Sequence, residues 1–541
     1  MNMELSSVIG CSQANNIICG SKLLAYKGEE LRFCVPPGNK ANSVSFFRRN
    51  TRWPNSSGLR FSLNVTAQSQ PQPIRSDNPS ARNPTRRSKK VDGLRLFVGL
   101  PLDAVSDCNT INHARAIAAG LRALKLLGIE GVELPIWWGV VEKEEMGKYE
   151  WSGYLALAEM VHNAGLKLHV SLCFHGNKQP KIPLPEWVLR IREAEPDIFY
   201  ADRSGQRYTD CLSVAVDELP VLNGKTPVQV YQEFCESFKS SFSQYMGTTV
   251  TGVTMGLGPD GELRYPSHHQ PVKSGKVFGA GEFQCYDKNM LGLLKKHAEA
   301  TGNPFWGLGG PHDAPAYGQL PNTSSFFNDN GGSWESPYGD FFLSWYSSQL
   351  LSHADRILSL ASTSFGDSSV AAYGKIPLMH SWSKMRSHPS ELTAGFHNTE
   401  NNDGYGAVAE MFARNSCKMI LPGMDLSDEH QPEGSLSSPE SVLAQIRAAC
   451  REHGVEVSGE NLVMSKASHG LEQIKKNTAG ENMVDLFTYQ RMGAAFFSPD
   501  HFRSFTAFVR SLNQLELHSD DLPEEEEMAQ TSSESSIMQA A

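Results

Sequence analysis

The sequence predicts an α/β fold in which eight parallel strands, each followed by a helix, close into a (β/α)8 TIM barrel with long βα loops. Two observations favour it. From about Leu94 onward, eight short apolar or β-branched runs alternate with longer helical patterns. Long insertions rich in Gly, Pro and Asn follow the third and fourth runs, at 176–228 and 258–339. A chain of 541 residues fits one such barrel with tails, because long loops can enlarge a barrel beyond about 400 residues.

Each expected strand is short and largely apolar, as in a parallel sheet covered on both faces. In chain order the expected strands are 94–100, 131–137, 167–174, 250–257, 375–380, 417–423, 454–459 and 484–490. The segments between them carry helical patterns, among them 112–128, 154–165, 341–361 and 441–454. Loops that follow the carboxyl ends of barrel strands build the active-site face, so the two long insertions are expected there.

Charge divides the chain into three expected parts. Residues 1–90 hold 14 Lys and Arg against 4 Asp and Glu, so the rest of the chain carries a net charge of -20. This basic, Ser- and Asn-rich start is typical of an organelle transit peptide with a disordered arm. A disordered arm without targeting and a basic nucleic-acid arm are the alternatives. Residues 91–518 form the expected barrel, and the acidic segment 519–541 is expected to be a disordered tail.

Composition also argues against several classes of function. The acidic barrel region argues against DNA or RNA as a partner, because phosphate contacts need a basic surface. The ten cysteines show no metal-ligand spacing, so neither a metal nor another cofactor is expected, and buried free thiols point to a reducing compartment. No uncharged apolar stretch is long enough for a transmembrane helix, and no membrane association is expected.

Two glutamates follow strands of the predicted barrel in a way that suits glycoside hydrolysis. Glu262 lies in GPDGELRYPSH after the fourth strand, and Glu460 lies in VSGEN after the seventh. Glycosidases need one protonated and one ionised carboxyl group on either side of the scissile bond. Strands of one barrel place such groups around the same opening, although a glutamate at the start of a loop is more often simply solvated. We therefore expect Glu262 and Glu460 to face each other across the barrel mouth.

Further polar and aromatic residues are expected at the same rim. The polar ones are His175, Lys375, His380, Asn461 and Arg491, and the aromatic ones are Trp137, Trp138 and Trp382. Sugars are bound by such donors and acceptors together with aromatic faces. The alternative is that the histidines and tryptophans belong to the core.

An ordered set of segments carries a resemblance to a known family. The segments are IWWGVVE, GLGPDGELRYPS, GEFQCYDK, FFLSWYSSQLLSHADRIL, SELTAGF, GEN and LFTYQRM. Across 94–515 they resemble the β-amylases, glycoside hydrolase family 14. The resemblance implies a (β/α)8 barrel and an inverting exo-hydrolysis of α-1,4-glucans that releases β-maltose. It also implies carboxyl groups about 6.5 to 9.5 Å apart, which leave room for a water.

The resemblance assigns roles residue by residue. Glu262 falls on the general acid and Glu460 on the general base. The positions that match sugar-binding residues of the family are His175, Lys375, His380, Asn461, Leu462 and Arg491. Starch, another α-1,4-glucan or maltose is the ligand that these roles imply.

The chain also departs from the family pattern at four places. Pro135 stands where active members carry an Asp, and Pro422 stands where the family presents a Thr. The loop after His175, GNKQPKIPLPEWV, is shorter than the family's mobile lid and lacks its second Asp. Leu462 is bulkier than the small residue that is common there. Each lost transition-state partner costs about 2 to 4 kcal/mol, or about 10² to 10³ in rate.

These departures are similar to those of an inactive plant branch of the family. Together with the resemblance, they lead us to expect a protein of the chloroplast stroma. It would have a glucan-binding cleft with weak or absent hydrolysis and act as a regulatory or binding component of starch breakdown. The alternative is an active 1,4-α-glucan maltohydrolase that uses the retained pair of glutamates. A transcription regulator is a third class, which the acidic domain and the lack of zinc ligands or heptads in 1–90 disfavour. The acidic loop with Asp425, Asp428 and Glu429 is a candidate contact for a protein partner in starch metabolism.

Overall fold

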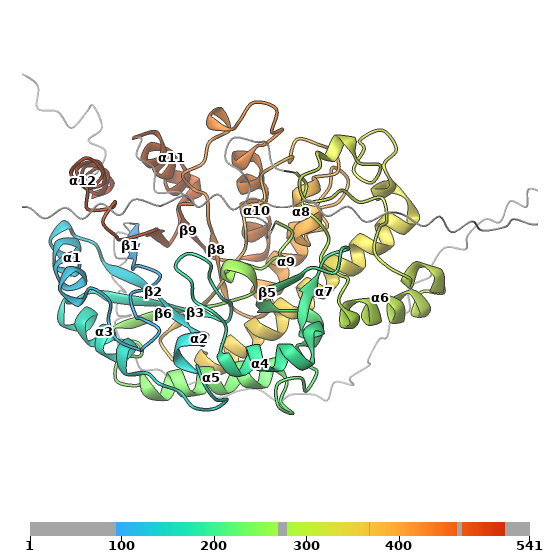
Figure 1. Ribbon diagram of the computed structural model, residues 1–541. Coiled ribbons are helices and arrows are strands. Elements are labelled where there is room, and N and C mark those ends of the chain that lie inside the picture. The colour runs from blue at the N-terminus through green and yellow to red at the C-terminus, as the bar shows by residue number, and fades with distance from the viewer. Residues whose placement is uncertain (1–93, 269–278, 367, 463–467, 514–541) are drawn as a thin grey trace, which may run out of the picture. The chain divides into compact units, whose positions relative to one another are not determined.

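Eight parallel strands close into a barrel in the order β1-β10-β9-β8-β7-β6-β3-β2 (Figure 1). The barrel strands are β1 (Arg95–Gly99), β2 (Gly131–Trp137), β3 (Lys167–Cys173), β6 (Val250–Met255), β7 (Ala371–Lys375), β8 (Lys418–Leu421), β9 (Val457–Glu460) and β10 (Leu486–Tyr489). The first and last strands pair with each other, with Arg95 opposite Leu486. This confirms the predicted (β/α)8 barrel.

The structure, a computed structural model, describes residues 94–268, 279–366, 368–462 and 468–513. The expected transit segment 1–90 and the expected acidic tail 519–541 lie outside the described residues. No helix among those described is long and apolar enough to cross a membrane. The seven cysteines of the described ranges are free thiols, six of them buried, with Cys108 exposed.

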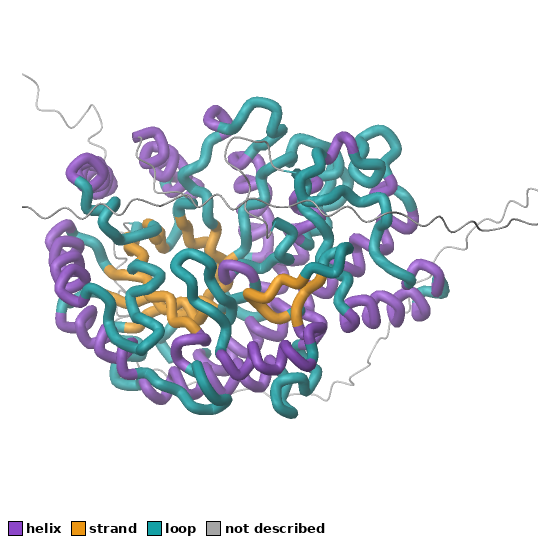
Figure 2. The backbone as a smooth tube through the Cα atoms, in the orientation of Figure 1, coloured by secondary structure: helices purple, strands orange, loops and turns teal. Residues whose placement is uncertain are grey.

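Helices surround the strands, as the purple and orange tubes of Figure 2 show. They are α1 (Ala114–Leu127), α2 (Trp138–Val141), α3 (Ser152–Asn163), α4 (Glu186–Ala194), α5 (Pro227–Ser241), α6 (Lys288–Ala300), α7 (Pro337–Phe365), α8 (Pro389–Ala394), α9 (Gly404–Arg414), α10 (Pro439–His453), α11 (Ser468–Thr478) and α12 (Pro499–Asn513). Local sequence explains several of their ends. Thr226 forms a capping box with Gln229 at the start of α5, and Ser336 caps α7 in front of Pro337.

The two long insertions contain structure of their own. The first holds α4 and an antiparallel hairpin of β4 (Phe199–Ala201) and β5 (Arg207–Leu212), which lies apart from the barrel strands in Figure 2. The second holds α6. Short 3-10 helices complete the chain at η1 (Pro196–Ile198), η2 (Val214–Val216), η3 (Pro259–Gly261), η4 (Pro304–Gly307), η5 (Pro321–Thr323), η6 (Ser333–Glu335), η7 (Asp428–His430) and η8 (Gly480–Asn482).

The fifth strand was misplaced by the prediction. It was expected at 375–380, but β7 occupies Ala371–Lys375, so Lys375 ends the strand instead of starting it. Pro377 has no N–H group for a sheet hydrogen bond, which disfavours the predicted run. The real strand is rich in small residues because its neighbours need the space. A Cβ atom on Gly374 would lie 2.9 Å from both Leu257 and Phe412.

The barrel interior becomes polar toward the active-site end. Glu133 of β2, His169 of β3 and Thr254 of β6 are all buried, with exposed fractions of 3 to 4 %. The ring of His169 lies against β6, where a Cβ on Gly252 would be only 2.7 Å from Nδ1, and its Nε2 is 2.6 Å from the Thr254 hydroxyl. Burial lowers the pKa of His169 to about 4, so this ring is neutral. A polar layer therefore lies beneath the mouth of the barrel.

Candidate active site

A cavity of about 280 Å³ opens at the carboxyl ends of the strands. All eight barrel strands, or the first residues after them, contribute to its wall. Its charged and polar members include Glu133, Ser171, His175, Asn177, Thr254, Asp260, Glu262, Lys375, Glu460, Asn461, Gln490 and Arg491. The cavity therefore brings together both predicted carboxyl groups and four of the other predicted polar residues. Ligands of barrel proteins bind at this end.

Glu460 is the last residue of β9 and forms a buried ion pair with Lys375 at the end of β7. Lys375 Nζ donates to Glu460 Oε2 at 2.6 Å, and the Glu460 side chain is 7 % exposed. Burial opposes the charged form of Lys375, yet Glu460, with Glu133 and Glu262 nearby, raises the pKa of this amine. The ammonium thus balances several carboxyl groups on the cavity floor.

Glu262 follows η3 at the end of the loop after β6. Its backbone pairs with Lys375 in an isolated bridge, and its Oε2 accepts a hydrogen bond from Arg264 Nε at 2.9 Å. Arg264 also contacts Asp260, whose positive φ of 55° turns the loop. Burial raises the pKa of Glu262 above its ordinary value, although Arg264 and Lys375 act in the opposite direction. A carboxyl group with a raised pKa is suited to donate a proton.

This raised pKa gives a testable pH dependence. We expect the Glu262 carboxyl to titrate above the ordinary value of about 4.3, measured as a carbon-13 shift in glutamate-labelled protein. The folded state then holds this proton more tightly than the unfolded chain. Stability from the protonated form is complete below the unfolded pKa and is lost as the pH rises through the folded one.

The variant Glu262→Gln is the control for this titration. It should remove the resonance with the raised midpoint and flatten the decline of the free energy of unfolding over the same pH window. A midpoint for Glu262 at or below the ordinary glutamate value would contradict the effect of burial.

Asn461 and Arg491 tie the ends of neighbouring strands together. Asn461 Nδ2 donates to Gln490 O at 2.9 Å, and Asn461 Oδ1 accepts from Gln490 N at 2.7 Å. Arg491 Nη1 lies 3.3 Å from Glu133 Oε2 and also donates to Leu100 O. Both predicted residues thus line the cavity, and their described contacts connect barrel strands to one another.

Glu133 is a cavity residue that the prediction missed. It is 4 % exposed, and burial alone would raise its pKa, but Arg491 and Lys375 lower the pKa below the ordinary value. The group is therefore an ionised carboxylate of the cavity. A charged residue inside the apolar run GVELPIW is the signal that could have found it, because a buried charge needs a partner.

The predicted histidines and tryptophans divide into two groups. His175 and Trp137 line the cavity and pack edge to face, with ring centroids 5.2 Å apart, and burial lowers the pKa of His175. His380 is not among the cavity residues, and its Nδ1 contacts the Ser437 hydroxyl at 2.7 Å. Neither Trp138 nor Trp382 lines the cavity. Trp138 is fully buried and donates to Glu142 Oε2 at 2.6 Å, as a core residue would.

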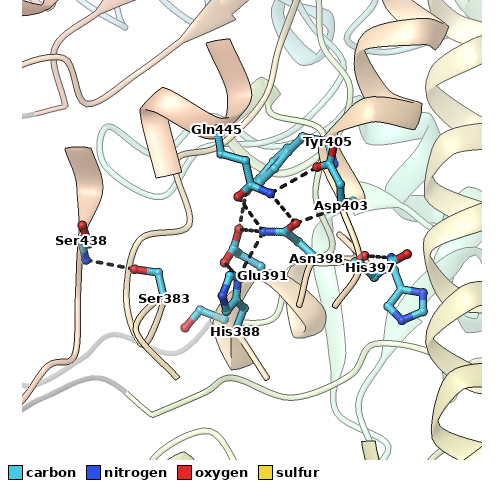
Figure 3. A network of polar contacts seen from close by, with 12 residues as sticks. Ser383, His388, Glu391, His397, Asn398, Asp403, Tyr405, Ser438 and Gln445 are labelled. Atoms are coloured by element: carbon cyan, nitrogen blue, oxygen red, sulfur yellow. Dashed lines mark hydrogen bonds and ion pairs between the residues drawn. The ribbon is translucent and has the colours of Figure 1, made fainter. Parts of the chain in front are cut away.

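A buried polar network holds the segment between β7 and α9 (Figure 3). The carboxyl group of Glu391, which is fully buried, accepts from Tyr405 OH at 2.7 Å and from Asn398 Nδ2 at 2.9 Å. Asn398 and Gln445 of α10 exchange two amide hydrogen bonds at 2.9 and 3.0 Å. The His388 Nδ1 atom lies 2.9 Å from Glu391 Oε2. The network fixes this loop at the barrel rim.

Comparison with known proteins identifies the family. The family model for glycosyl hydrolase family 14 matches residues 97–516. The chain belongs to glycosyl hydrolase family 14. It is 59% identical over 536 residues to "Inactive beta-amylase 9" of Arabidopsis thaliana, with 98% of each chain covered.

Two other Arabidopsis thaliana proteins are also similar to this chain. "Inactive beta-amylase 4, chloroplastic" is 35% identical, covering 94% of this chain and 99% of the relative. "Beta-amylase 1, chloroplastic" is 41% identical, covering 78% and 76%. The two of these three relatives that align over nearly the whole chain are thus named inactive, which favours the inactive β-amylase type over an active one. The catalytic domain of β-amylase from Paenibacillus polymyxa shares the fold, with a TM-score of 0.64, 24% identity, and coverage of 78% of this chain and 99% of that one.

The loop expected to replace the family's lid is a short turn tied to the β4-β5 hairpin. Asn177 and Ile182 exchange two backbone hydrogen bonds at 2.7 and 2.8 Å, and Asn177 Nδ2 donates to Pro180 O at 2.7 Å. Lys178 Nζ lies 3.8 Å from Asp210 Oδ2 and 5.6 Å from the centre of the Tyr208 ring. These contacts hold the turn beside the cavity.

The other departures from the family pattern also lie at the cavity. Pro135, Pro422 and Leu462 line its wall, and Leu462 is 52 % exposed. Proline has no N–H donor, and leucine offers a sugar hydroxyl no side-chain partner. These three positions of the wall therefore offer no side-chain hydrogen bond to a ligand.

The acidic loop considered for partner binding uses two of its carboxylates internally. Asp425 Oδ1 accepts from Leu462 N at 2.7 Å. Asp428 accepts from the Ser438 hydroxyl at 2.6 Å and from Glu440 N at 3.1 Å, at the start of α10. Glu429 is exposed. Partner binding by this loop stays a prediction.

Proposed function

We propose that this protein holds the end of an α-1,4-glucan chain in the barrel cavity and hydrolyses it weakly or not at all. Both glutamates line that cavity, while Pro135, Pro422 and Leu462 offer no side-chain hydrogen bond to a sugar. This combination carries the proposal. A wall that keeps charged anchors but lacks transition-state partners favours binding over turnover. The function that we propose is regulatory, as a glucan-responsive component of starch breakdown.

Maltose release from soluble starch tests the proposal. Each missing transition-state partner costs about 10² to 10³ in rate, so we expect release at least about 10³-fold below that of an active β-amylase. Calorimetric titration with maltooligosaccharides should still detect binding. A turnover within about tenfold of the active enzyme would contradict the proposal, because it would leave less than about 1.4 kcal/mol for all the losses together.

An active maltohydrolase is the second candidate, supported by the raised pKa of Glu262 in the cavity that also holds Glu460. If any maltose release is genuine, Glu262→Gln should abolish it, because glutamine cannot donate the proton. Release that survives this substitution comes from another source, such as a contaminating hydrolase. The same assay thus separates the two candidates.

We also propose that the protein works in the plastid stroma. Support comes from the basic, acid-poor segment 1–90 and from relatives that are named chloroplastic. A fluorescent fusion of the full chain should enter chloroplasts, and a fusion that lacks 1–90 should not. A protein partner in starch metabolism would fit the regulatory role. Affinity capture with the full chain from a stromal extract would search for it.

A further inference from the structure

A second cavity, of about 400 Å³, lies at the opposite end of the barrel from the glutamate pair. Its wall is formed by the starts of β1, β9 and β10 and by the last turns of α10. In this fold that end ordinarily serves stability, and the catalytic loops lie at the other. A ligand bound here would therefore be separate from the glucan site.

The charge of this cavity differs from that of the surrounding chain. Three arginines line it, Arg95, Arg447 and Arg451, against two acids, Glu456 and Asp485. Residues from 91 onward, in contrast, carry a net charge of -20. The cavity is thus a cationic spot on an acidic protein.

Both acids of the wall are already paired with cations. Asp485 Oδ2 lies 2.9 Å from Arg95 Nη2 and 2.9 Å from Lys418 Nζ, and Glu456 Oε2 lies 2.5 Å from Lys418 Nζ. The described residues show no carboxylate within 4.0 Å of Arg447 or Arg451, whereas Arg95 has two such partners. Arg447 and Arg451 therefore supply the uncompensated positive charge.

Arg447 is an unusual cation because its side chain is buried, with 6 % of the residue exposed. Its Nη2 donates to Asn477 O and lies 3.5 Å from Met424 Sδ. A guanidinium carries five N–H donors, so these contacts use only part of its capacity. Burial, together with the charge of Arg451, lowers the pKa of Arg447 to about 10. Burying this cation costs free energy unless an anion binds beside it.

Arg451 lies one helical turn after Arg447 on α10 and is exposed. Residues four apart lie on one helix face, and two like charges at that spacing repel each other. A structural role explains only part of this pair. Arg447 links α10 to the carbonyl groups at the end of α11, which favour a cation. That link accounts for one arginine and not for the second beside it.

We propose that the cavity between α10 and the starts of β1, β9 and β10 binds a phosphate group, free or carried by a small sugar, through Arg447 and Arg451. Forked guanidinium groups match the oxygens of a phosphate. The cavity volume leaves room for more than the phosphate itself, and Val455, Val457 and Met483 provide an apolar wall for an attached ring. The proposal does not depend on glucan binding at the other end.

Titration of the full chain tests this site with inorganic phosphate and with glucose 6-phosphate, by calorimetry and by thermal unfolding at constant ionic strength. Phosphate should raise the unfolding temperature more than chloride, because a ligand that binds only the folded state stabilises it. Arg451→Gln should weaken the affinity about tenfold, the effect of losing one charge-assisted hydrogen bond. Tighter binding of glucose 6-phosphate than of phosphate would identify the sugar as part of the ligand.

Arg122→Gln is a matched control, because Arg122 is an exposed arginine of α1 that does not line the cavity. It should bind phosphate as the unchanged protein does. Arg447→Gln should abolish binding, and if that variant does not fold, Arg451→Gln alone decides. Equal stabilisation by phosphate and chloride, or an affinity that is unchanged in Arg451→Gln, would overturn the proposal. Because Glu262→Gln leaves this site intact, its phosphate affinity should not change.

Discussion

Replacing Glu460 with alanine is expected to lower the free energy of unfolding by about 3 to 5 kcal/mol, the usual cost of breaking a buried ion pair. Lys375, 2.6 Å away, would lose its nearest carboxylate while 80 % of its side chain stays covered. An ammonium in that position is stabilised by charge and cannot easily reach water. The measurement is chemical denaturation at neutral pH.

Two further variants make this prediction specific. Glu145→Ala breaks an exposed ion pair with Lys148, whose side chains are 63 % and 71 % exposed, and should cost less than about 1 kcal/mol. The double variant Lys375→Met with Glu460→Gln should regain part of the loss, since no unpaired charge remains between the two positions. A loss for Glu460→Ala no larger than that for Glu145→Ala would show that the buried pair is not required.

Replacing Glu391 with alanine is expected to cost about 3 to 5 kcal/mol as well. The substitution leaves Tyr405 OH without its acceptor and removes one of the acceptors of Asn398 Nδ2, which keeps Gln445, in a position that is fully buried (Figure 3). Each buried donor without a partner costs about 1 to 3 kcal/mol, and the emptied space adds a cavity. Chemical denaturation measures the loss, and cleavage by a protease within 376–400 should become faster as the loop loosens.

The matched controls for Glu391 separate charge from shape. Glu391→Gln keeps an acceptor and the volume, so it should lose clearly less than the alanine variant. Glu400→Ala removes an exposed partner of Arg386 in the same segment and should change the stability by less than about 1 kcal/mol. Equal losses for Glu391→Ala and Glu400→Ala would mean that the network does not hold the loop.

Much of the barrel could be predicted because parallel strands covered on both faces are continuous apolar runs. Strand β7 could not be predicted, because its composition is set by contacts with Phe412 and Leu257 from distant parts of the chain. That error carried over to the site. With the strand expected to start four residues and to end five residues too late, His380 was placed on the strand that ends at Lys375.

The candidate site was predictable where a polar residue follows within a few residues of a strand end, as for Glu262 and Asn461. The direction in which neighbouring side chains point was harder to predict. Trp137 reaches the cavity while Trp138 packs against Trp187 in the core, with ring centroids 5.7 Å apart. Glu133 was overlooked because a carboxylate inside a strand is ordinarily excluded by its cost, which Arg491 and Lys375 offset here.

The turn between Asn177 and Ile182 has a kinetic consequence. Because its backbone hydrogen bonds already close it on itself, an oligosaccharide can enter and leave without waiting for that segment to swing. On the proposed function, we therefore expect both association and release of the oligosaccharide to be fast. The fraction of the protein that holds a glucan would then follow the concentration of free chain ends without delay.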